Sequence, residues 1–397
     1  MGGRLCCNAV IHKNFMIVDM VQKLTSLRNS ILILFLILII VNCSDDQTLT
    51  EPDSIDLPVQ EKSIEEIIAE KIDSFSVATG CVGLSVGYLM EDERYYHSKG
   101  VLNKTANVPC DENTIYEIAS LTKSFTGFLI ADLELQNKLS LNDTINLITD
   151  LYIPKIYDTE IKVIDLCTHS SGLKSFPGQG SKSTSEILDI YKTYDATLLK
   201  NYLTHAVFLF QPGTEFHYSN MGYAILGYTA ELNFGQEYET LIKEKICGPL
   251  GMEDTRITLN SEQQKRFVTA YNEDGEIVSH WEFKIFAGAA ALRSTVKDML
   301  SYVEGNIGVR APELEERFQM THRSLRFNYG LGWFVSDYGG NEIIFHDGLT
   351  YGSNTYVKFS KTKKIGLVVL SNQSFYYNHD GKNIYTLSNE LWRVLNN

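Results

Sequence analysis

The alternation of apolar and polar residues predicts helices and strands along the chain from residue 61 onward. Apolar residues recur at helical spacing over 64–72, and two runs of strand composition follow at 82–88 and 94–101. Ser120 opens a further helix, whose inner face is predicted to hold Leu121, Phe125, Phe128, Leu129 and Leu133. These elements begin one continuous unit that we expect to span residues 61–397.

The last third of the chain returns to strands. Four short, apolar, turn-bounded runs predict strands at 329–335, 342–346, 355–359 and 365–370. The charged stretch Lys361–Lys364 fits a hairpin tip, and an amphipathic helix over 383–395 closes the chain. Between the two strand regions, residues 125–280 mix helical periodicity with loops such as the Ser- and Gly-rich 170–185.

Residues 1–42 resemble a bacterial lipoprotein signal peptide. The apolar run of eleven residues at Ile31–Val41 is too short to span a bilayer but has the length of a signal-peptide core. Cys43 stands where such a signal carries its lipidated cysteine, although Asn42 replaces the small residue usual before it. Residues 43–60, polar and with two prolines, predict a tether. We expect a protein exported to the bacterial cell envelope and anchored to its membrane by a lipid on Cys43; plain secretion and a retained hydrophobic tail are the alternatives.

Composition narrows the classes of function. A chain of 397 residues with 44% hydrophobic and 21% charged residues is typical of a globular protein with a large core. Its net charge of −14 argues against nucleic acid as a partner. The nine histidines are scattered without a metal-ligand spacing, so we expect no metal and no other cofactor.

The cysteines show no disulfide framework. Two of the seven lie in the signal region and Cys43 is assigned to the lipid, which leaves Cys81, Cys110, Cys167 and Cys247. A unit of this size does not need a disulfide for stability. We expect buried free thiols, with a Cys81–Cys110 disulfide as the alternative.

The first motif with chemical meaning is Ser-x-x-Lys, which occurs four times. The copies at Ser171, Ser294 and Ser360 fit a turn, a helix start and a hairpin tip. Ser120 instead opens the apolar helix, with Lys123 three residues later on the same face, so the amine can reach the hydroxyl. A helix start also favours developing negative charge. Ser120 and Lys123 are therefore a candidate nucleophile and proton carrier; the alternative is a helix-capping serine beside a solvated lysine.

Two further motifs each occur twice and are separated by their context. Tyr218-x-Asn220 follows a Pro-Gly loop and precedes a helix-like segment, and His346-x-Gly348 ends an apolar strand. The second copies fall together at 376–381, in a turn that fits a structural role. The first copies suit the edge of a substrate cleft, where Gly348 lets one backbone approach another.

With these motifs, the chain resembles the serine β-lactamase and penicillin-binding-protein superfamily. It is most similar to the class C branch, which includes D-alanyl-D-alanine carboxypeptidases, D-amino-acid peptidases and esterases. The three motifs keep the order and spacing of that branch over nearly all of residues 61–395. Further segments resemble the branch in the same order, namely Leu166-Cys167-Thr168-His169-Ser170-Ser171-Gly172-Leu173, Gln211-Pro212-Gly213-Thr214, Pro249-Leu250-Gly251-Met252, Gly288 to Asp298 and Val368 to Asn372.

The resemblance implies an α+β fold with two lobes, an antiparallel sheet flanked by helices and a mostly helical lobe, with the site between them. It implies that Ser120 is the nucleophile and that Lys123 and Tyr218 exchange its proton, which requires a lowered pKa of the amine or the phenol. Asn220 would bind the substrate amide. The oxyanion hole would consist of the backbone N–H groups of Ser120 and Leu349.

The third motif departs from the β-lactamase pattern. Those enzymes usually carry lysine where His346 stands, and a histidine there resembles the peptidase and esterase members. The hold of His346 on a substrate carboxylate would depend on its charge near neutral pH; the alternative is a strand-end histidine satisfied by its neighbours. His169 and His217 flank motifs and are expected to be structural.

Three functional classes follow. The leading one is an exported serine hydrolase that forms an acyl-enzyme with peptides containing D-amino acids, or with β-lactams that mimic them, close to peptidoglycan. The second is an esterase of small acyl esters on the same scaffold. The third is a non-enzymatic binding protein, which the intact Ser120, Lys123 and Tyr218 disfavour.

Overall fold

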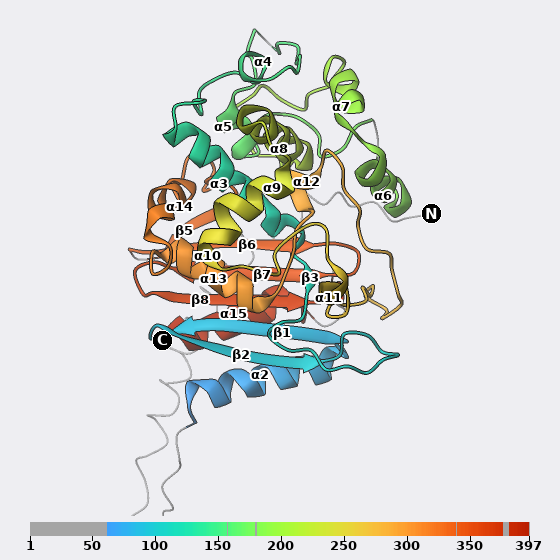
Figure 1. Ribbon diagram of the computed structural model, residues 1–397, viewed down its shortest axis with the longest axis vertical. Coiled ribbons are helices and arrows are strands. Elements are labelled where there is room, and N and C mark those ends of the chain that lie inside the picture. The colour runs from blue at the N-terminus through green and yellow to red at the C-terminus, as the bar shows by residue number, and fades with distance from the viewer. Residues whose placement is uncertain (1–61, 157, 179–180, 339, 376–380, 397) are drawn as a thin grey trace, which may run out of the picture. The chain divides into compact units, whose positions relative to one another are not determined.

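The fold is built on an antiparallel sheet formed by strands from the early and the late parts of the described chain (Figure 1). A computed structural model describes residues 62–156, 158–178, 181–338, 340–375 and 381–396. Within them, six strands lie in the order β2-β1-β8-β7-β6-β5. Their bounds are β1 (Gly83–Met90), β2 (Glu93–Gly100), β5 (Phe334–Tyr338), β6 (Asn341–Leu349), β7 (Asn354–Ser360) and β8 (Ile365–Ser371), and a separate pair consists of β3 (Tyr116–Glu117) and β4 (Arg293–Ser294).

Strand β8 joins the early strands of the sheet to the late ones and explains the apolar run predicted at 365–370. It pairs with β1 on one side, where Leu84 lies opposite Ser371, and with β7 on the other. All seven of its residues are buried because both of its faces are covered. Leu367 and Val369 face the cluster with α2 and α15, and Val368 and Leu370 face the main core. A strand buried on both faces needs no polar alternation.

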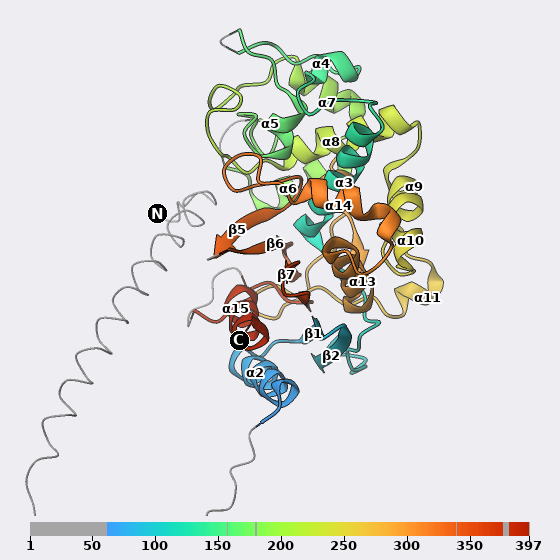
Figure 2. The same ribbon diagram turned by 90° about the vertical axis from the view of Figure 1, so that its left-hand side faces the viewer.

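Helices cover both faces of the sheet. Helices α2 (Ile64–Thr79) and α15 (Ile384–Asn396) lie together on one face, as Figure 2 shows, while α13 (Val296–Ile307) packs on the other against β1 and β8. A capping box at Ser63 and Glu66 starts α2, and Gly80 ends it in the left-handed conformation. This confirms the predicted antiparallel sheet flanked by helices.

Most of the remaining helices form the lobe beside β6 and β5, in the upper half of Figure 1, whereas α10 and α11 lie lower, at the level of the sheet. Helix α3 lies at the centre of the lobe and is buried on every side from Thr122 to Leu133, rather than on one inner face as predicted. A helix covered all round shows little amphipathic pattern. The bounds are α3 (Thr122–Leu135), α4 (Ile145–Ile148), α5 (Val163–Cys167), α6 (Thr184–Thr193), α7 (Ala196–Leu203), α8 (Asn220–Phe234), α9 (Tyr238–Ile242), α10 (Gly248–Leu250), α11 (Ser261–Gln264), α12 (Ala287–Ala290) and α14 (Glu315–Thr321), with short η turns at Ala119–Leu121, Lys243–Cys247 and Pro312–Leu314.

The predicted strand at 329–335 is wrong over most of its length. Strand β5 begins at Phe334, and the preceding residues form a tight turn in which the Gly330 N–H donates to Trp333 O. This turn lies against α3: a Cβ on Gly332, whose φ is +84°, would come within 2.4 Å of Lys123 O. The close approach of the two backbones, rather than sheet pairing, therefore sets the conformation of this apolar run.

Two further expectations concern the cysteines and the N-terminal region. Cys81, Cys110, Cys167 and Cys247 are free thiols, which confirms the expectation of no disulfide, and burial raises the pKa of Cys110 to about 11. The predicted signal peptide, Cys43 and the tether to residue 60 lie outside the described residues. In the part of the chain that is described, no helix has both the length and the apolar character needed to cross a membrane.

Candidate active site

Ser120 lies in a tight turn between a short strand and a buried helix. The chain runs from β3 through the turn Ala119–Leu121 into α3, and Ala119 adopts a left-handed φ of +49°. Such a conformation costs a non-glycine residue free energy and is held by its surroundings. Leu121, not Ser120, occupies the N-cap of α3, so the helix-capping alternative for Ser120 is wrong. The Ser120 side chain is partly exposed and free to meet a substrate.

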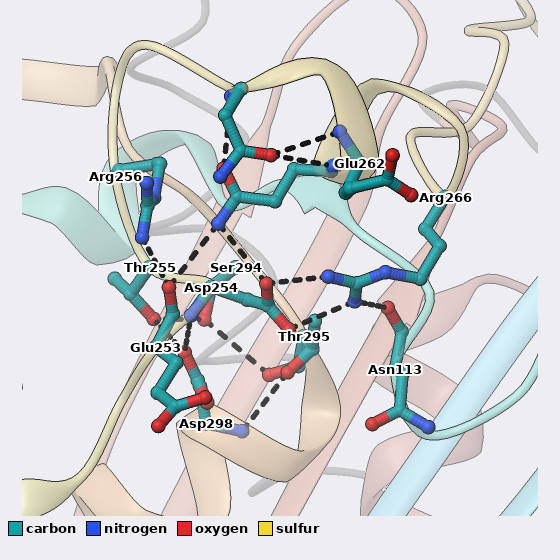
Figure 3. A network of polar contacts seen from close by, with 12 residues as sticks. Asn113, Glu253, Asp254, Thr255, Arg256, Glu262, Arg266, Ser294, Thr295 and Asp298 are labelled. Atoms are coloured by element: carbon teal, nitrogen blue, oxygen red, sulfur yellow. Dashed lines mark hydrogen bonds and ion pairs between the residues drawn. The ribbon is translucent and has the colours of Figure 1, made fainter.

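A network beside β4 fixes the strand that leads to Ser120 (Figure 3). The Asp298 carboxylate accepts from Asp254 N–H at 2.8 Å and from the Thr255 hydroxyl at 2.9 Å, and Thr255 Oγ1 lies 2.7 Å from Ser294 Oγ. Ser294 pairs with Tyr116 of β3. The Ser-x-x-Lys copy at Ser294 therefore supports the turn at Ser120 and lies apart from the reacting groups.

Lys123 is fully buried and surrounded by three oxygens. Its Nζ lies 3.0 Å from Ser120 Oγ, 2.8 Å from Asn220 Oδ1 and 2.9 Å from Ala289 O. The latter two oxygens can only accept hydrogen bonds, so they take two N–H groups of the amine. In the neutral amine, the third direction is a lone pair that points at the Ser120 hydroxyl.

Burial lowers the pKa of the Lys123 amine well below its usual range, and the Asp347 carboxylate opposes that shift. The lone pair directed at Ser120 is therefore available to accept the serine proton. The proposed proton exchange requires a lowered pKa of either the lysine amine or the tyrosine phenol. The structure assigns the lowered pKa to Lys123.

Tyr218 differs from Lys123 in its protonation. Its ring centroid lies 4.8 Å from Lys123 Nζ, and its hydroxyl is hydrogen-bonded to Ser120. Burial raises the pKa of the Tyr218 phenol above its usual range, and the bond to Ser120 opposes the rise. The phenol therefore keeps its proton at neutral pH and can act as a donor.

Asn220 holds Lys123 and is itself held by a residue that no motif indicated. Its side-chain Nδ2 donates to the Tyr191 hydroxyl at 3.1 Å, while Oδ1 accepts from Lys123. Tyr191 lies on α6 and is 1% exposed. Ser175 was also missed: its hydroxyl donates to Tyr218 O at 2.7 Å and accepts from Asn220 N–H at 3.3 Å. The structure thus gives Asn220 a positioning contact with Lys123, and its predicted contact with substrate stays a prediction.

His346 is buried and belongs to a chain of hydrogen bonds. Its Nε2 lies 3.0 Å from the Tyr329 hydroxyl and its Nδ1 lies 2.6 Å from Asp347 O. The same hydroxyl lies 3.3 Å from Nε2 of His169, whose Nδ1 accepts from Ser219 N–H at 3.1 Å. His346 is 1% exposed and His169 is 0% exposed.

The groups at the two ends of this series of hydrogen bonds determine where each of its protons lies. Ser219 N–H can only donate, so His169 carries its proton on Nε2 and donates to Tyr329, which donates in turn to His346 Nε2. The His346 Nδ1–H then donates to the Asp347 carbonyl. Both imidazoles are neutral, and burial lowers the pKa of His346 to about 3. His346 therefore carries no charge at neutral pH, in contrast to the conditional charge considered from the sequence.

Gly348 brings β6 against the turn at Ser120. A Cβ on Gly348 would lie 2.5 Å from Ile118 O and 3.1 Å from the Ala119 Cβ, so only glycine allows this approach. The Glu117 carboxylate accepts from Thr350 at 3.0 Å, and Ser353 donates to Glu117 O at 2.7 Å. The end of β6 is therefore fixed beside Ser120.

The register of the sheet directs the Leu349 N–H into the site. Thr350 N–H donates to Ser353 O at 2.9 Å, so the next pair, Leu349 with Asn354, is a non-hydrogen-bonded pair in which N–H groups point away from β7. Strand β5 pairs with β6 only as far as Phe345 and leaves this edge open. This geometry fits the predicted oxyanion hole at Ser120 and Leu349.

Known proteins share both the sequence pattern and the fold. The profile of the family described as Beta-lactamase matches residues 66–387. A β-lactamase of Pseudomonas fluorescens is 24% identical over 356 residues, which cover 79% of this chain and 94% of that protein. Protein flp of Staphylococcus aureus (strain MRSA252) is 25% identical over 320 residues, which cover 76% of this chain and 59% of that protein.

Solved structures resemble the sheet and the helical lobe together. A class C β-lactamase superposes with a TM-score of 0.73 at 23% identity, over 83% of this chain and 96% of the other. A β-lactamase/D-alanine carboxypeptidase from Pseudomonas syringae gives a TM-score of 0.71 at 20% identity, over 84% of this chain and 98% of the other. The α+β fold is that of these enzymes. Because the family profile spans most of its length, the chain belongs to the Beta-lactamase family and is a serine hydrolase.

Proposed function

We propose that this protein hydrolyses an amide or ester bond through an acyl-enzyme on Ser120. The observation that carries the proposal is the buried Lys123 amine, 3.0 Å from Ser120 Oγ, with its other two polar contacts taken by oxygens that only accept. A neutral amine so oriented is a general base for the serine hydroxyl.

In the first step Ser120 Oγ adds to the substrate carbonyl carbon as its proton passes to Lys123 Nζ. The carbonyl π electrons move onto oxygen, where the N–H groups of Ser120 and Leu349 stabilise the negative charge. The tetrahedral intermediate then collapses and expels the amine or alcohol. Tyr218 donates the proton that the leaving group needs and regains one from Lys123. Water repeats the same steps and releases the acid, which restores Ser120.

For the substrate, we propose peptides that contain D-amino acids, or β-lactams, as the first class. The names of similar proteins support it, since they include β-lactamases and a β-lactamase/D-alanine carboxypeptidase. Export and a lipid anchor on Cys43, inferred from residues 1–60 alone, would bring the enzyme close to peptidoglycan.

Esterase activity on small acyl esters is the second candidate, and His346 favours it. The residue stands where β-lactamases usually carry lysine, yet it is buried, neutral and engaged on both ring nitrogens. A neutral group at this position gives no ionic hold on a substrate carboxylate, and simple esters need none.

Intact-protein mass spectrometry tests the proposal. The full chain is incubated with a penicillin and, separately, with a 4-nitrophenyl ester, beside Ser120→Ala and the control Ser360→Ala, which alters another Ser-x-x-Lys serine. We expect a covalent adduct, or turnover, in the wild type and in the control but not in Ser120→Ala. An adduct that persists in Ser120→Ala would refute the assignment of the nucleophile. Turnover of the ester without reaction of the penicillin would select the second candidate.

A further inference from the structure

An exposed carboxylate stands in the third motif, and the proposed reaction does not use it. Asp347 lies on β6 between His346 and Gly348, and the alternation of strand side chains turns it away from the buried face that these two share. Strand β5 ends its pairing at Phe345, so β6 is uncovered at this point. The Asp347 side chain is exposed beside the edge that carries the Leu349 N–H.

The Asp347 charge acts on the reacting groups. Its carboxylate is close enough to raise the pKa of both Lys123 and Tyr218. No ion pair to Asp347 forms within the described part of the chain. Neighbouring protein atoms partly desolvate the Asp347 carboxylate and raise its pKa, and a hydrogen bond from its own backbone N–H opposes that rise.

The basic groups of the three motifs do not offset this charge. Lys123 and His346 are buried with lowered pKa values, and the chain of hydrogen bonds through Tyr329 holds His346 neutral. The motifs thus present one ionised side chain at the substrate edge, and it is an acid.

We propose that Asp347 selects substrates by charge, disfavouring a carboxylate and favouring an ammonium group next to the bond that is cleaved. The proposal rests on the proposed function in taking Ser120 as the nucleophile. Among the substrates of the proposed function, it predicts that those with a free α-carboxylate, as in penicillins and peptides with a C-terminal acid, react more slowly than uncharged or cationic esters and amides. The charge of Asp347 therefore favours the second candidate, the esterase, and peptides without a free carboxylate within the first class. Two exposed unit charges roughly 4–6 Å apart in water interact strongly enough to change a rate about three- to fivefold.

Three aryl esters of one acyl group test the selectivity. Their leaving groups are 3-carboxyphenol, phenol and 3-(trimethylammonio)phenol, and each kcat/KM is compared between the wild type and Asp347→Asn. The intrinsic reactivity of each ester cancels in that comparison. Measured against the neutral ester, we expect the substitution to raise kcat/KM about three- to fivefold for the anionic ester and to lower it by a similar factor for the cationic one. A change common to all three esters would report the effect of Asp347 on Lys123 and Tyr218.

The control is Glu93→Gln, which removes an exposed acid from β2, four strands away from β6. It should leave all three values unchanged. Equal changes for the three esters in Asp347→Asn, or no change in any, would overturn the proposal.

If ester turnover is slow, a second measurement tests the role of Ser120 as nucleophile separately from the charge selection by Asp347. Binding of the matching 3-carboxy-, unsubstituted and 3-(trimethylammonio)phenylboronic acids is measured by calorimetry in wild type, Asp347→Asn and Ser120→Ala. Equal binding by Ser120→Ala and wild type would count against the nucleophile. The ratio of anionic to cationic affinity in Asp347→Asn, relative to wild type, reports on Asp347 alone, and an unchanged ratio would refute the charge selection.

Discussion

Replacing Tyr329 by phenylalanine should destabilise the protein more than the loss of one ordinary hydrogen bond. The hydroxyl accepts from His169 and donates to His346, at 3.3 and 3.0 Å, and both histidines are at most 1% exposed. The substitution therefore leaves two buried imidazole nitrogens without partners and without access to water. Each orphaned group costs about 1–3 kcal/mol, so we expect the free energy of unfolding to fall by about 2–6 kcal/mol. That is a large share of a typical total of about 5–15 kcal/mol.

Urea unfolding followed by tryptophan fluorescence and circular dichroism measures this loss, with Tyr238→Phe as the matched control. Tyr238 is also buried, and its hydroxyl lies 2.7 Å from Thr126 Oγ1, but Thr126 keeps Gly288 O as a partner at 2.7 Å. We expect the control to lose only about 1 kcal/mol. If Tyr329→Phe lost no more than the control, the assigned chain of protons through His169, Tyr329 and His346 would be refuted.

Three further predictions concern protonation and close packing. His346 keeps a pKa of about 3 when folded, against about 6.5 when unfolded, so the unfolded state binds more protons below pH 6.5. The stability from this neutral burial is complete above pH 6.5 and should fall by about 1.4 kcal/mol per unit as the pH drops; urea unfolding at pH 7, 6 and 5 checks this, and a flat profile would contradict it. Lys123→Arg keeps the hydrogen-bond donors but cannot lose its proton, so kcat/KM should fall at least about a hundredfold at every pH, and recovery at high pH would argue against Lys123 as the base. Gly348→Ala places a Cβ 2.4 Å from Thr355 Oγ1 and should lower kcat at least about tenfold, whereas Gly80→Ala, with open space around it, should leave kcat unchanged; equal activities of the two variants would show that the contact is not needed.

Much of the fold could be predicted from the sequence because most strands are marked by an apolar run or by turn residues at their ends. The apolar run of β8 is buried on both faces, and the hairpin of β1 and β2 is bounded by turn residues. The tight turn at 329–333 was not predictable in this way. Its apolar residues resemble a strand locally, and only contact with α3, about 200 residues earlier, forces the backbone out of the sheet.

The same distinction applies to the site. Ser120 and Lys123 are neighbours on one turn of the chain, so their pairing follows from local geometry. Tyr191, Ser175 and Tyr329 show no motif, because their roles arise from contacts with residues distant in sequence or across a loop. The neutral state of His346 depends on burial at the end of β6, which a sequence cannot report for a single polar residue.

The pairing of β1 with β8 also governs how this enzyme can be made. Leu84 of β1 pairs with Ser371 of β8, which is synthesised about 290 residues later. The centre of the sheet therefore cannot form until almost the whole chain has been made. At typical rates of synthesis of about 5–20 residues per second, the apolar edge of β1 is available to other chains for about 15–60 seconds on the ribosome. Such long-range pairing also slows folding after release. Ser120, Lys123 and Tyr218 are all synthesised within this interval, yet the edge of β6 that completes their site is added near its end. A nascent chain that already contains Ser120 is therefore not yet active. During synthesis, we expect chaperones to be needed for the unpaired edge of β1 more than for the helical lobe.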